Sequence, residues 1–307
     1  MLRQMRALRS IDEIARQGSI RRAAERLAVA PSVVQRRLAD VEADLGVLLF
    51  ERLQTGMRPT SAGEVLLAWI RRQSAEFDQV RSQIEDIQGM QFGAVRIACS
   101  QALAAGFLQA EVKRFRQRYK KVAFHVSVES HGRAFEALAA YEIDLALVFR
   151  PRLVAGVSVL ARTEQRLCAV MAATHPLATR PEVRLRDCAG YPAALLDENF
   201  VSREIINALL AGTSTALNVA LESNSFEMLS QFVMDTDAIT FQIEAGLPAD
   251  AALATRPVVE AERISCSLVL AKMEGRALPV AADAFARQIA GRLNAGELWC
   301  TDRHCVG

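Results

Sequence analysis

The stretch from residue 20 to residue 63 constrains this chain most, because it places two short amphipathic helices, a tight turn, a hairpin and a helix start in close succession. Ser19 is a good N-cap for the first helix, whose apolar residues recur at helical spacing, namely Ile20, Ala23, Ala24 and Leu27. Pro31 suits the first position of the second helix and Gly46 its end; between them an apolar face repeats at Val34, Leu38, Val41 and Leu45. The two helices can therefore pack against each other across a turn of three residues.

The other face of the second helix is polar and basic, with Ser32, Val33, Gln35, Arg36 and Arg37. In a helix-turn-helix, the start of the second helix meets base edges in the major groove while the first helix crosses the backbone. Gln35 can address adenine, Ser32 can address several bases, and Val33 can meet a thymine methyl group. The pattern predicts a DNA-reading face, and the alternative is an ordinary helical hairpin with a solvated basic face.

A short hairpin is predicted next, because the apolar run of residues 48–52 precedes a turn signal at residues 54–57. Arg52 and Arg58 would flank this wing, where guanidinium groups can bind phosphates. Ser61 and Glu64 have capping-box spacing for the following helix, although Thr60 is an alternative cap. The predicted DNA contacts are Arg21, Arg22, Pro31, Ser32, Val33, Gln35, Arg36, Arg37, Arg52 and Arg58.

At these residues the chain resembles the LysR-type transcriptional regulators. The resemblance rests on Gly18-Ser19, Ala23-Ala24-Glu25-Arg26-Leu27, Pro31-Ser32-Val33-Val34, Leu38, Val41-Glu42, Leu45-Gly46, Leu49-Phe50-Glu51-Arg52 and Pro59-Thr60-Ser61-Ala62-Gly63. It continues through residues 93–98, 143–147 and 175–178, so it spans essentially the whole chain. Ala30 and Gln35 depart from the family, which usually has serine at the turn and again inside the recognition helix. The resemblance implies the DNA-reading role, but not the operator that relatives prefer.

The distribution of charge agrees with a DNA-binding N-terminal part. Residues 1–72 contain 13 arginines, no lysine and 8 acidic residues, a net charge of +5, whereas the remaining 235 residues carry −3 and the whole chain +2. Positive charge is therefore concentrated where phosphate would be met. No long apolar run and no signal-peptide core are evident, so the sequence predicts a cytoplasmic protein with no membrane partner.

The six cysteines, at positions 99, 168, 188, 266, 300 and 305, have no metal-ligand spacing. In a reducing compartment they are most simply free thiols, so no metal and no cofactor are predicted. A redox-sensing regulator that uses one of these cysteines is the alternative, since thiol reactivity depends on exposure and pKa.

A long helix is predicted over residues 61–88. Its apolar residues follow a heptad seam with one polar position, formed by Leu66, Ile70, Gln73, Phe77, Val80, Ile84 and Ile87. A second copy of the chain is the simplest partner for this seam. A homodimer would pair two N-terminal DNA-binding domains, here called the heads, and would so match a pseudo-palindromic operator. The resemblance likewise implies a dimerising linker helix. The alternative is a surface helix packed on its own domain.

From residue 93 onward, strands and helices alternate. Strands are predicted at residues 95–99, 122–129 and 145–149, with helices at 103–119 and 132–140 between them. This order implies a parallel sheet with helices on its faces. A second such block has strands at 167–172, 193–196, 217–221 and 238–241 with helices at 202–211 and 226–234, before a final strand at 267–271 and helix at 280–293.

The predicted fold class is α/β, with an N-terminal all-α winged helix-turn-helix, a long linker helix and a two-lobed, periplasmic-binding-protein-like effector domain. The predicted boundaries are residues 1–60 for the DNA-binding domain and 61–90 for the linker helix. The first lobe is assigned to residues 93–163 and 268–300, and the second lobe to residues 164–267.

A ligand is expected in the cleft between the lobes, because such folds bind ligands where strands end and helix N-termini offer free N–H groups. The candidates are Ser100, Gln101, Ser130, His131, Arg133, Asp197, Asn199, Phe200, Ser202, Ser223, Asn224, Phe241 and Gln242. The family resemblance also places its small organic effector here, with Ser100 and His131 at contact positions. Ser100 and Arg133 would favour a carboxylate. The structural alternatives are helix caps at Ser100, His131 and Asn224 and a solvated Arg133.

The sequence therefore predicts a sequence-specific transcriptional regulator controlled by a small-molecule effector. An enzyme is not predicted, because the chain has no phosphate-binding glycine loop, paired-histidine metal motif or nucleophile elbow. The expected partners are double-stranded DNA, the effector and further copies of the chain, as a homodimer or homotetramer, with RNA polymerase as a further candidate. A small-molecule-binding protein without DNA function is the second alternative.

Overall fold

The computed structural model describes residues 2–87, 92–151, 155–247 and 250–295. The chain forms two compact units, residues 1–81 and residues 82–307. The first unit contains α1 (Leu2–Gln17), α2 (Ile20–Leu27), α3 (Pro31–Leu45), β1 (Phe50–Leu53) and β2 (Gly56–Pro59), after which α4 (Ser61–Ile87) begins. The predicted tandem helices and the hairpin are thus present, whereas α1 was not predicted.

The predicted ends of α2 and α3 are confirmed, whereas α4 is capped by the alternative, Thr60, whose Oγ1 accepts the Gly63 N–H at 3.1 Å. Ser19 Oγ accepts a hydrogen bond from the Arg22 backbone N–H at the start of α2, Pro31 is the first residue of α3, and Gly46 ends α3 with a φ of 69°. The turn between the helices uses Ala28 in the left-handed region, with a φ of 53°. These caps fix the angle between α2 and α3 that the packing of their small and branched residues requires.

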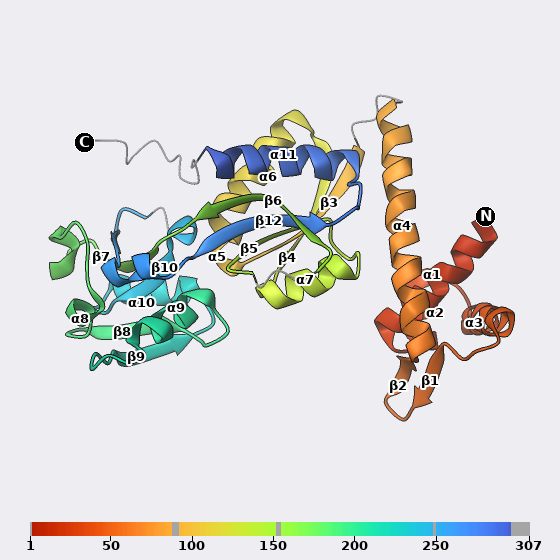
Figure 1. Cartoon of the computed structure of the whole chain (residues 1–307), viewed down its shortest axis with the longest axis horizontal. Coiled ribbons are helices and arrows are strands. Elements are labelled where there is room, and N and C mark those ends of the chain that lie inside the picture. Colours follow the sequence, from red (N-terminus) through yellow and green to blue (C-terminus); the bar gives the residue numbers. More distant parts are fainter. Residues whose placement is uncertain (1, 88–91, 152–154, 248–249, 296–307) are drawn as a thin grey trace. The chain divides into compact units, whose positions relative to one another are not determined.

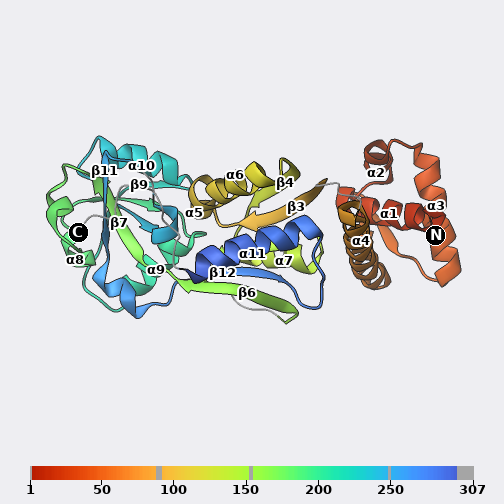
Figure 2. The ribbon, with the colours of Figure 1, turned by 90° about the horizontal axis from the view of Figure 1, so that it is seen from above.

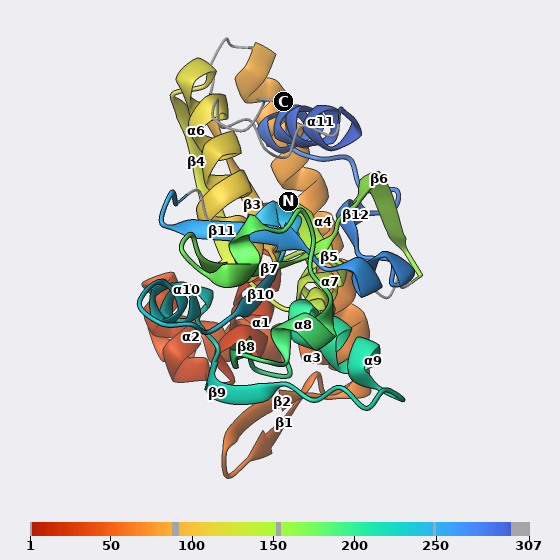
Figure 3. The same cartoon turned by 90° about the vertical axis from the view of Figure 1, so that its left-hand side faces the viewer.

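A single apolar core holds the first unit together, and it draws on every helix. It contains Ile11, Ile14, Ala23, Ala24, Val34, Leu38, Leu49, Phe50, Leu67 and Ile70. The hairpin is tied to the turn after α1, because the Met57 N–H donates to the Gly18 carbonyl at 2.8 Å. Gly56 allows this approach, since a Cβ there would lie 2.4 Å from the same carbonyl oxygen. The β1–β2 hairpin projects from the start of α4 as a wing (Figures 1 and 3).

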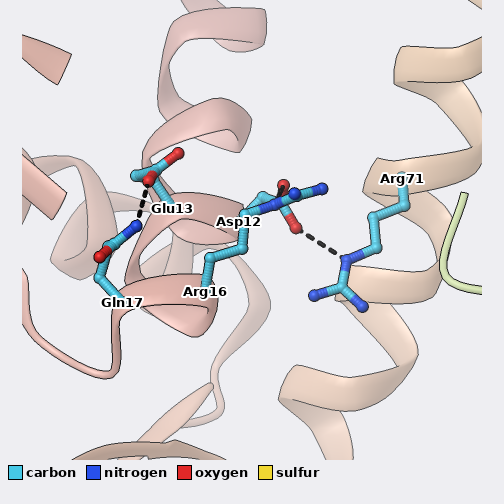
Figure 4. Close-up of polar contacts among 5 residues, drawn as sticks. All are labelled: Asp12, Glu13, Arg16, Gln17 and Arg71. Atoms are coloured by element: carbon cyan, nitrogen blue, oxygen red, sulfur yellow. Dashed lines mark hydrogen bonds and ion pairs between the residues drawn. The ribbon is translucent and has the colours of Figure 1, made fainter. Parts of the chain in front are cut away.

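An ion pair that is largely shielded from solvent joins α4 to α1. Asp12 Oδ1 lies 2.8 Å from Arg71 Nε, while Asp12 Oδ2 lies 2.7 Å from Arg16 Nε on its own helix (Figure 4). Both Asp12 and Arg71 are largely shielded from solvent, with 18% and 20% of their side chains exposed. Charge-assisted hydrogen bonds in such a setting hold a fixed geometry, so the first turns of α4 move with the head.

The predicted seam of α4 is corrected at its start. Ile70 is buried in the head core and Leu66 packs against that core, so neither faces outward. Phe77, Val80 and Ile84 are exposed, as predicted for a free seam, and the exposed face continues toward the helix start through Val65 and Trp69. The side chain of Ile87 lies outside the described residues. A dimerising role for this helix stays a prediction.

The second unit contains two lobes. The first is a five-stranded sheet of order β4-β3-β5-β12-β6, built from β3 (Phe92–Cys99), β4 (Lys121–Val128), β5 (Leu145–Phe149), β6 (Val157–Glu164) and β12 (Ser267–Met273). β3 pairs in parallel with β4 and β5, as predicted. β12 runs antiparallel to both β5 and β6, and β6 was not predicted, so the sheet is mixed.

Helices cover both faces of this sheet (Figures 1 and 2). One face carries α5 (Gln101–Leu103), the π-helix η1 (Ala104–Leu108), α6 (Gln109–Arg118) and α11 (Val280–Asn294), and the other carries α7 (His131–Ala139). β5 shows why: Leu145, Leu147 and Phe149 enter the core beneath α11, while Ala146 and Val148 pack with α7. A continuous apolar run is the expected sequence of a strand buried on both sides.

The second lobe differs from the predicted parallel block. β7 (Leu167–Ala172) lies between β10 (Thr240–Ile243) and β11 (Leu253–Pro257) and is antiparallel to both, whereas β8 (Pro192–Leu196) and β9 (Asn218–Ser223) are parallel. β11 was not predicted. The lobe also contains α8 (Leu185–Cys188), α9 (Val201–Leu210), α10 (Phe226–Met234) and the 3-10 turns η2 (Pro176–Thr179), η3 (Glu244–Gly246) and η4 (Val259–Arg263).

The chain crosses between the lobes twice, from β6 to β7 and from η4 to β12. The two crossings run side by side, because the Gln165 N–H donates to the Cys266 carbonyl at 2.8 Å. Arg150, which directly follows β5 and has a φ of 40°, donates its N–H to the Ser267 carbonyl at 2.7 Å. Two adjacent crossings of this kind form a connection about which two lobes can hinge.

Candidate functional site

The outer face of α3 is free. Ser32, Gln35 and Arg36 are exposed and Val33 is half-buried, while Val34 and Leu38 on the opposite face are buried in the head core. The second helix of the pair is therefore anchored along one side and presents polar, hydrogen-bonding groups along the other. This is the arrangement that a recognition helix needs, because its side chains must reach base edges without moving the helix.

Arg37 does not belong to this outer face. Its Nη1 donates to Ser10 Oγ at 3.0 Å, and the Ser10 hydroxyl, which is fully buried, donates in turn to the Arg6 carbonyl at 3.0 Å. Successive residues of a helix point about 100° apart, so Arg36 and Arg37 face different surroundings. The structure gives Arg37 a contact between α3 and α1, and its role as a DNA contact stays a prediction.

The other predicted arginines lie around the periphery of the head. Arg22 and Arg52 are exposed, Arg21 lies 3.3 Å from Glu25, and Arg58 lies 2.7 Å from Glu51 across the hairpin. Such exposed ion pairs contribute at most about 1 kcal/mol, so an incoming phosphate can displace the carboxylates. Phosphate binding by these four arginines stays a prediction.

Glu42 positions the hairpin and was not among the predicted site residues. Its Oε1 accepts hydrogen bonds from the backbone N–H groups of Leu49, at 2.7 Å, and Phe50, at 3.4 Å. The end of α3 is thereby joined to the start of β1. A carboxylate that accepts two backbone donors fixes the wing relative to the recognition helix.

A cavity of about 220 Å³ lies between the two lobes, at the ends of β3, β4 and β10. The predicted candidates that line it are Ser100, Gln101, Ser130, His131, Asn199, Phe200, Ser202 and Gln242. The sequence reasoning missed further lining residues, among them Glu129 and the apolar Val128, Phe149 and Ile243. Among the described residues that line the cavity, none is a lysine or an arginine.

Two helices start at the cavity. α7 follows Ser130, whose Oγ accepts from the Arg133 N–H, and α9 follows Phe200, which provides no side-chain cap. Ser100 does not act as the side-chain cap of α5; its Oγ instead accepts from the Phe149 N–H at 3.3 Å and lies between two strand ends. Helix N-termini present N–H donors and a partial positive charge, so the cavity suits a small anion of low charge.

Five candidates lie outside this cavity. Arg133 is exposed, and its hydrogen bond to Glu136 raises the pKa of the guanidinium. Asp197 Oδ1 accepts the Asn199 N–H within a turn, and Ser223 Oγ accepts the Ser225 N–H. Phe241 is only 2% exposed and packs in the core. Asn224 contributes its carbonyl, which accepts a hydrogen bond from Gln101 Nε2 across the lobes at 3.0 Å.

The described cysteines are poorly suited to redox chemistry. Cys99, Cys168, Cys188 and Cys266 are all buried, and burial raises the pKa of each thiol to about 12. A protonated, shielded thiol is a weak nucleophile. Cys300 and Cys305 lie outside the described residues. Over the described ranges, no cluster of histidine, cysteine and carboxylate side chains could hold a metal ion.

No helix in the described part of the chain combines the length and the apolar character that a bilayer span requires.

Comparison with solved structures gives the fold. A full-length OxyR variant from Pseudomonas aeruginosa superposes with a TM-score of 0.70 at 19% identity, covering 94% of each chain. A full-length CbnR in complex with its target DNA superposes with a TM-score of 0.60 at 17% identity, covering 94% of this chain and 99% of that one.

Comparison of sequences gives the family. Residues 5–64 match the model of the bacterial regulatory helix-turn-helix protein of the lysR family, and residues 88–294 match the LysR substrate binding domain. A probable RuBisCO transcriptional regulator from Synechocystis sp. is 28% identical over 232 residues, which cover 74% of this chain and 67% of that protein. A probable nitrogen assimilation transcriptional activator from Synechococcus elongatus is 26% identical over 263 residues, which cover 84% and 85%. The chain is a DNA-binding transcriptional regulator with an effector-binding domain and not an enzyme, and it belongs to the LysR family.

Proposed function

We propose that the outer face of α3 reads the bases of an operator while the wing holds the flanking phosphates. The observation that carries this proposal is the division of α3 into a side locked in the head core and a side that leaves Ser32, Gln35 and Arg36 exposed. Glutamine can bond adenine through two hydrogen bonds, and arginine can bond guanine or phosphate. Arg52 and Arg58 on the hairpin supply contacts that are independent of sequence.

Two substitutions separate these roles. Arg52→Ala should weaken binding to every duplex by a similar factor and should reduce the salt dependence by about 0.9 per lost phosphate contact. Gln35→Ala should change the ranking of duplexes, because a base contact is worth about 1–3 kcal/mol of discrimination. Fluorescence anisotropy with labelled duplexes measures both effects.

The matched control is Arg72→Ala, which removes an exposed arginine of α4 beyond the wing and should leave DNA affinity unchanged. Equal losses on all duplexes for Arg52→Ala and Gln35→Ala would contradict the division into phosphate and base contacts.

The exposed face of α4 supports a homodimer. Val65, Trp69, Phe77, Val80 and Ile84 leave between 38% and 73% of their surfaces exposed, and apolar residues at this spacing bury against a second helix in many assemblies. Phe77→Asp should therefore shift the molecular mass in sedimentation velocity toward the monomer. Ser74→Asp, at an exposed polar position of the same helix, should leave the mass unchanged. An unaltered mass for Phe77→Asp would remove this face from the interface.

The cavity between the lobes fits a small carboxylate as effector. Its volume of about 220 Å³, the N-termini of α7 and α9 and the hydroxyls of Ser100 and Ser202 support this choice, and the described part of the lining offers no arginine or lysine to a more highly charged ligand. An effector that prefers one arrangement of the lobes would shift the balance between arrangements. On this proposal the regulator acts in the cytoplasm, where it binds duplex DNA.

Calorimetry with small monocarboxylates, such as pyruvate and benzoate, tests the cavity. Ser100→Ala should weaken any carboxylate that binds, because its hydroxyl lies at the junction of two strand ends. Arg133→Ala is the matched control, since its side chain is exposed and pairs with Glu136. Weaker binding by Arg133→Ala and full binding by Ser100→Ala would contradict this location.

A further inference from the structure

The cavity between the lobes has different polar groups on its two sides. The second lobe contributes the end of β8, the turn before α9, the first turn of α9 and the end of β10. The first lobe contributes the ends of β3, β4 and β5 and the starts of α5 and α7. The class of carboxylate that the proposed effector site takes therefore depends on what each lobe presents to the ligand.

The second lobe presents hydrogen-bond donors to the cavity. Ser202 lines the cavity and is only 4% exposed, yet its hydroxyl has no hydrogen-bond partner among the described residues. That hydroxyl is open to the cavity, because it does not belong to the described polar atoms that lack both a partner and accessible surface. Gln242 is 2% exposed and accepts the Ile243 N–H through its Oε1 at 2.9 Å, which leaves its amide nitrogen for the cavity. Because an unpaired buried donor is unfavourable, both groups favour a ligand that accepts hydrogen bonds.

The first turn of α9 adds backbone donors on the same side. Phe200 starts the helix without a side-chain cap, and Glu204 is the first residue whose N–H donates back to it, through the Phe200 carbonyl at 3.0 Å. The N–H groups of residues 201–203 precede that bond, and such groups at a helix N-terminus bind anions. Together with Ser202 and Gln242, they make the second lobe the side that suits a carboxylate.

The first lobe presents a carboxylate instead. Glu129 directly follows β4 and lines the cavity, and in the described lining it is the only acidic residue, with His131 as the one other ionisable group. No described residue forms an ion pair with Glu129. The exposed Arg133 pairs with Glu136, which is the main cause that raises the pKa of this guanidinium, whereas Glu129 is the smallest cause. A simple monocarboxylate in the cavity would therefore meet a like charge without a cation between them.

We propose that the effector is a small aliphatic α-amino acid, whose carboxylate binds Ser202, Gln242 and the start of α9 while its ammonium group binds Glu129. This assignment refines the proposed carboxylate effector and rests on it. The ammonium group compensates the charge of Glu129, and a buried charge is tolerated when it is paired. The volume of about 220 Å³ lies below the range of about 300–1,000 Å³ of drug-sized pockets, so the side chain is short. Apolar lining residues surround it, namely Val128, Phe149, Leu196, Phe200 and Ile243.

A ligand with two charged ends bonds both lobes at once, because its carboxylate lies against the second lobe and its ammonium group against the first. The lobes already meet beside the cavity, where Gln101 Nε2 donates to the Asn224 carbonyl at 3.0 Å. An acid or an amine of the same size would bond only one lobe. The amino acid should therefore favour the arrangement in which the lobes lie close together.

Calorimetric titration of the full-length protein with matched probes tests the assignment. The amino acids are L-alanine, L-valine and L-leucine, and each is compared with the acid that lacks its ammonium group and the amine that lacks its carboxylate. For leucine these analogues are 4-methylpentanoate and 3-methylbutylamine. The wild-type protein should bind at least one of the three amino acids about tenfold more tightly than either of its analogues, because each analogue loses one charged hydrogen-bonding group.

Two substitutions address the two sides of the cavity separately. Glu129→Gln should weaken the bound amino acid about tenfold, while the matched acid binds as tightly as before or more tightly. Ser202→Ala should weaken the amino acid and the acid by a similar factor and leave the amine unchanged.

The matched control is Glu136→Gln, which removes the same charge from an exposed position of α7 outside the cavity and should bind all probes like the wild type. Binding of the acids as tightly as of their amino acids would overturn the amino-acid assignment and leave a carboxylate effector in place. Binding of no acid and no amino acid would overturn both. An amino-acid preference that Glu129→Gln retains would also contradict the assignment. Circular dichroism shows that each variant is folded.

Discussion

The neighbouring arginines of α3 allow the account of the DNA-reading head to be tested sharply, because the structure gives them opposite roles. Arg36 is exposed on the outer face, whereas Arg37 Nη1 bonds Ser10 Oγ at 3.0 Å on the inner side. Arg36→Ala and Arg37→Ala remove the same charge from adjacent positions of one helix. Any difference between the two variants therefore reports the direction of the side chain rather than the net charge of the head.

The two substitutions should affect different measured quantities, namely DNA binding for Arg36→Ala and stability for Arg37→Ala. Arg36→Ala should change the free energy of unfolding by less than about 0.5 kcal/mol, as exposed substitutions do. Its loss should reduce the slope of log affinity against log salt by about 0.9 for each head that meets a phosphate, or by about 1.8 for a dimer. Where Arg36 bonds guanine instead, the slope should stay and one base preference should be lost.

Arg37→Ala should instead destabilise the head by about 1–2 kcal/mol, because it removes a charged hydrogen bond to a fully buried hydroxyl. The Ser10 hydroxyl keeps its bond to the Arg6 carbonyl, so the loss should not exceed this range. Urea denaturation measures stability, and anisotropy titrations from about 50 to 200 mM salt measure the slope. A slope lowered by Arg37→Ala as much as by Arg36→Ala, with no loss of stability, would refute this reasoning.

Three further predictions concern the second unit. His175 Nδ1 accepts the Leu177 N–H, and burial lowers the pKa of the imidazole in the folded protein. Because the unfolded chain then binds the proton more readily, the free energy of unfolding should fall as the pH drops below about 6.5. The slope is at most about 1.4 kcal/mol per pH unit, and His175→Gln should flatten it in urea titrations at several pH values. Arg276→Met should destabilise the first lobe by about 3–5 kcal/mol, since its guanidinium bonds the fully buried Asp144 carboxylate at 2.6 Å; a loss below about 1 kcal/mol in chemical denaturation would contradict this role. Phe241→Ala should cost about 3–5 kcal/mol as a core deletion while calorimetry shows unchanged carboxylate affinity in the protein that remains folded.

Local signals in the sequence predicted the head well, because its boundaries depend on residues with strong backbone preferences. Ser19, Pro31 and Gly46 each mark a helix end where the structure has one. The first helix escaped prediction, although Ile11 and Ile14 are central to the core. Its sequence contains the spacing of a helix but no marked cap before it. The helix is instead defined by tertiary packing, because the partners of Ile11 and Ile14 lie in α2, α3 and α4.

The candidate site could be predicted only to the level of the segments that form it. Strand ends and helix starts identified the cavity, but the direction of a side chain depends on where a strand ends. Phe241 and Gln242 are adjacent in β10 and point to opposite faces, so Gln242 lines the cavity while Phe241 packs in the core. Ile243 shares the face of Phe241 and lines the cavity as the last residue of the strand. On a helix, the direction of a side chain depends on its position around the axis, and Arg133 is exposed on α7, where it pairs with Glu136.

Contacts between residues far apart in the sequence were beyond local reasoning. The bond between Arg37 and Ser10 and the anchoring of the wing by Glu42 depend on the angle between α1, α3 and the hairpin. The antiparallel pairing of β10 and β11 with β7 likewise depends on the path of the chain, since apolar strands of similar length can pair in either direction.

Selection of bound duplexes from a random library by the full-length protein tests the central claim most directly, because it asks whether a paired head reads sequence. The account predicts that the wild-type protein enriches an inverted repeat, with half-sites one helical turn or a multiple of it apart. Gln35→Ala should enrich an inverted repeat of the same spacing with an altered base inside each half-site. Enrichment of no sequence by the wild type, or of the same repeat by Gln35→Ala, would contradict the account.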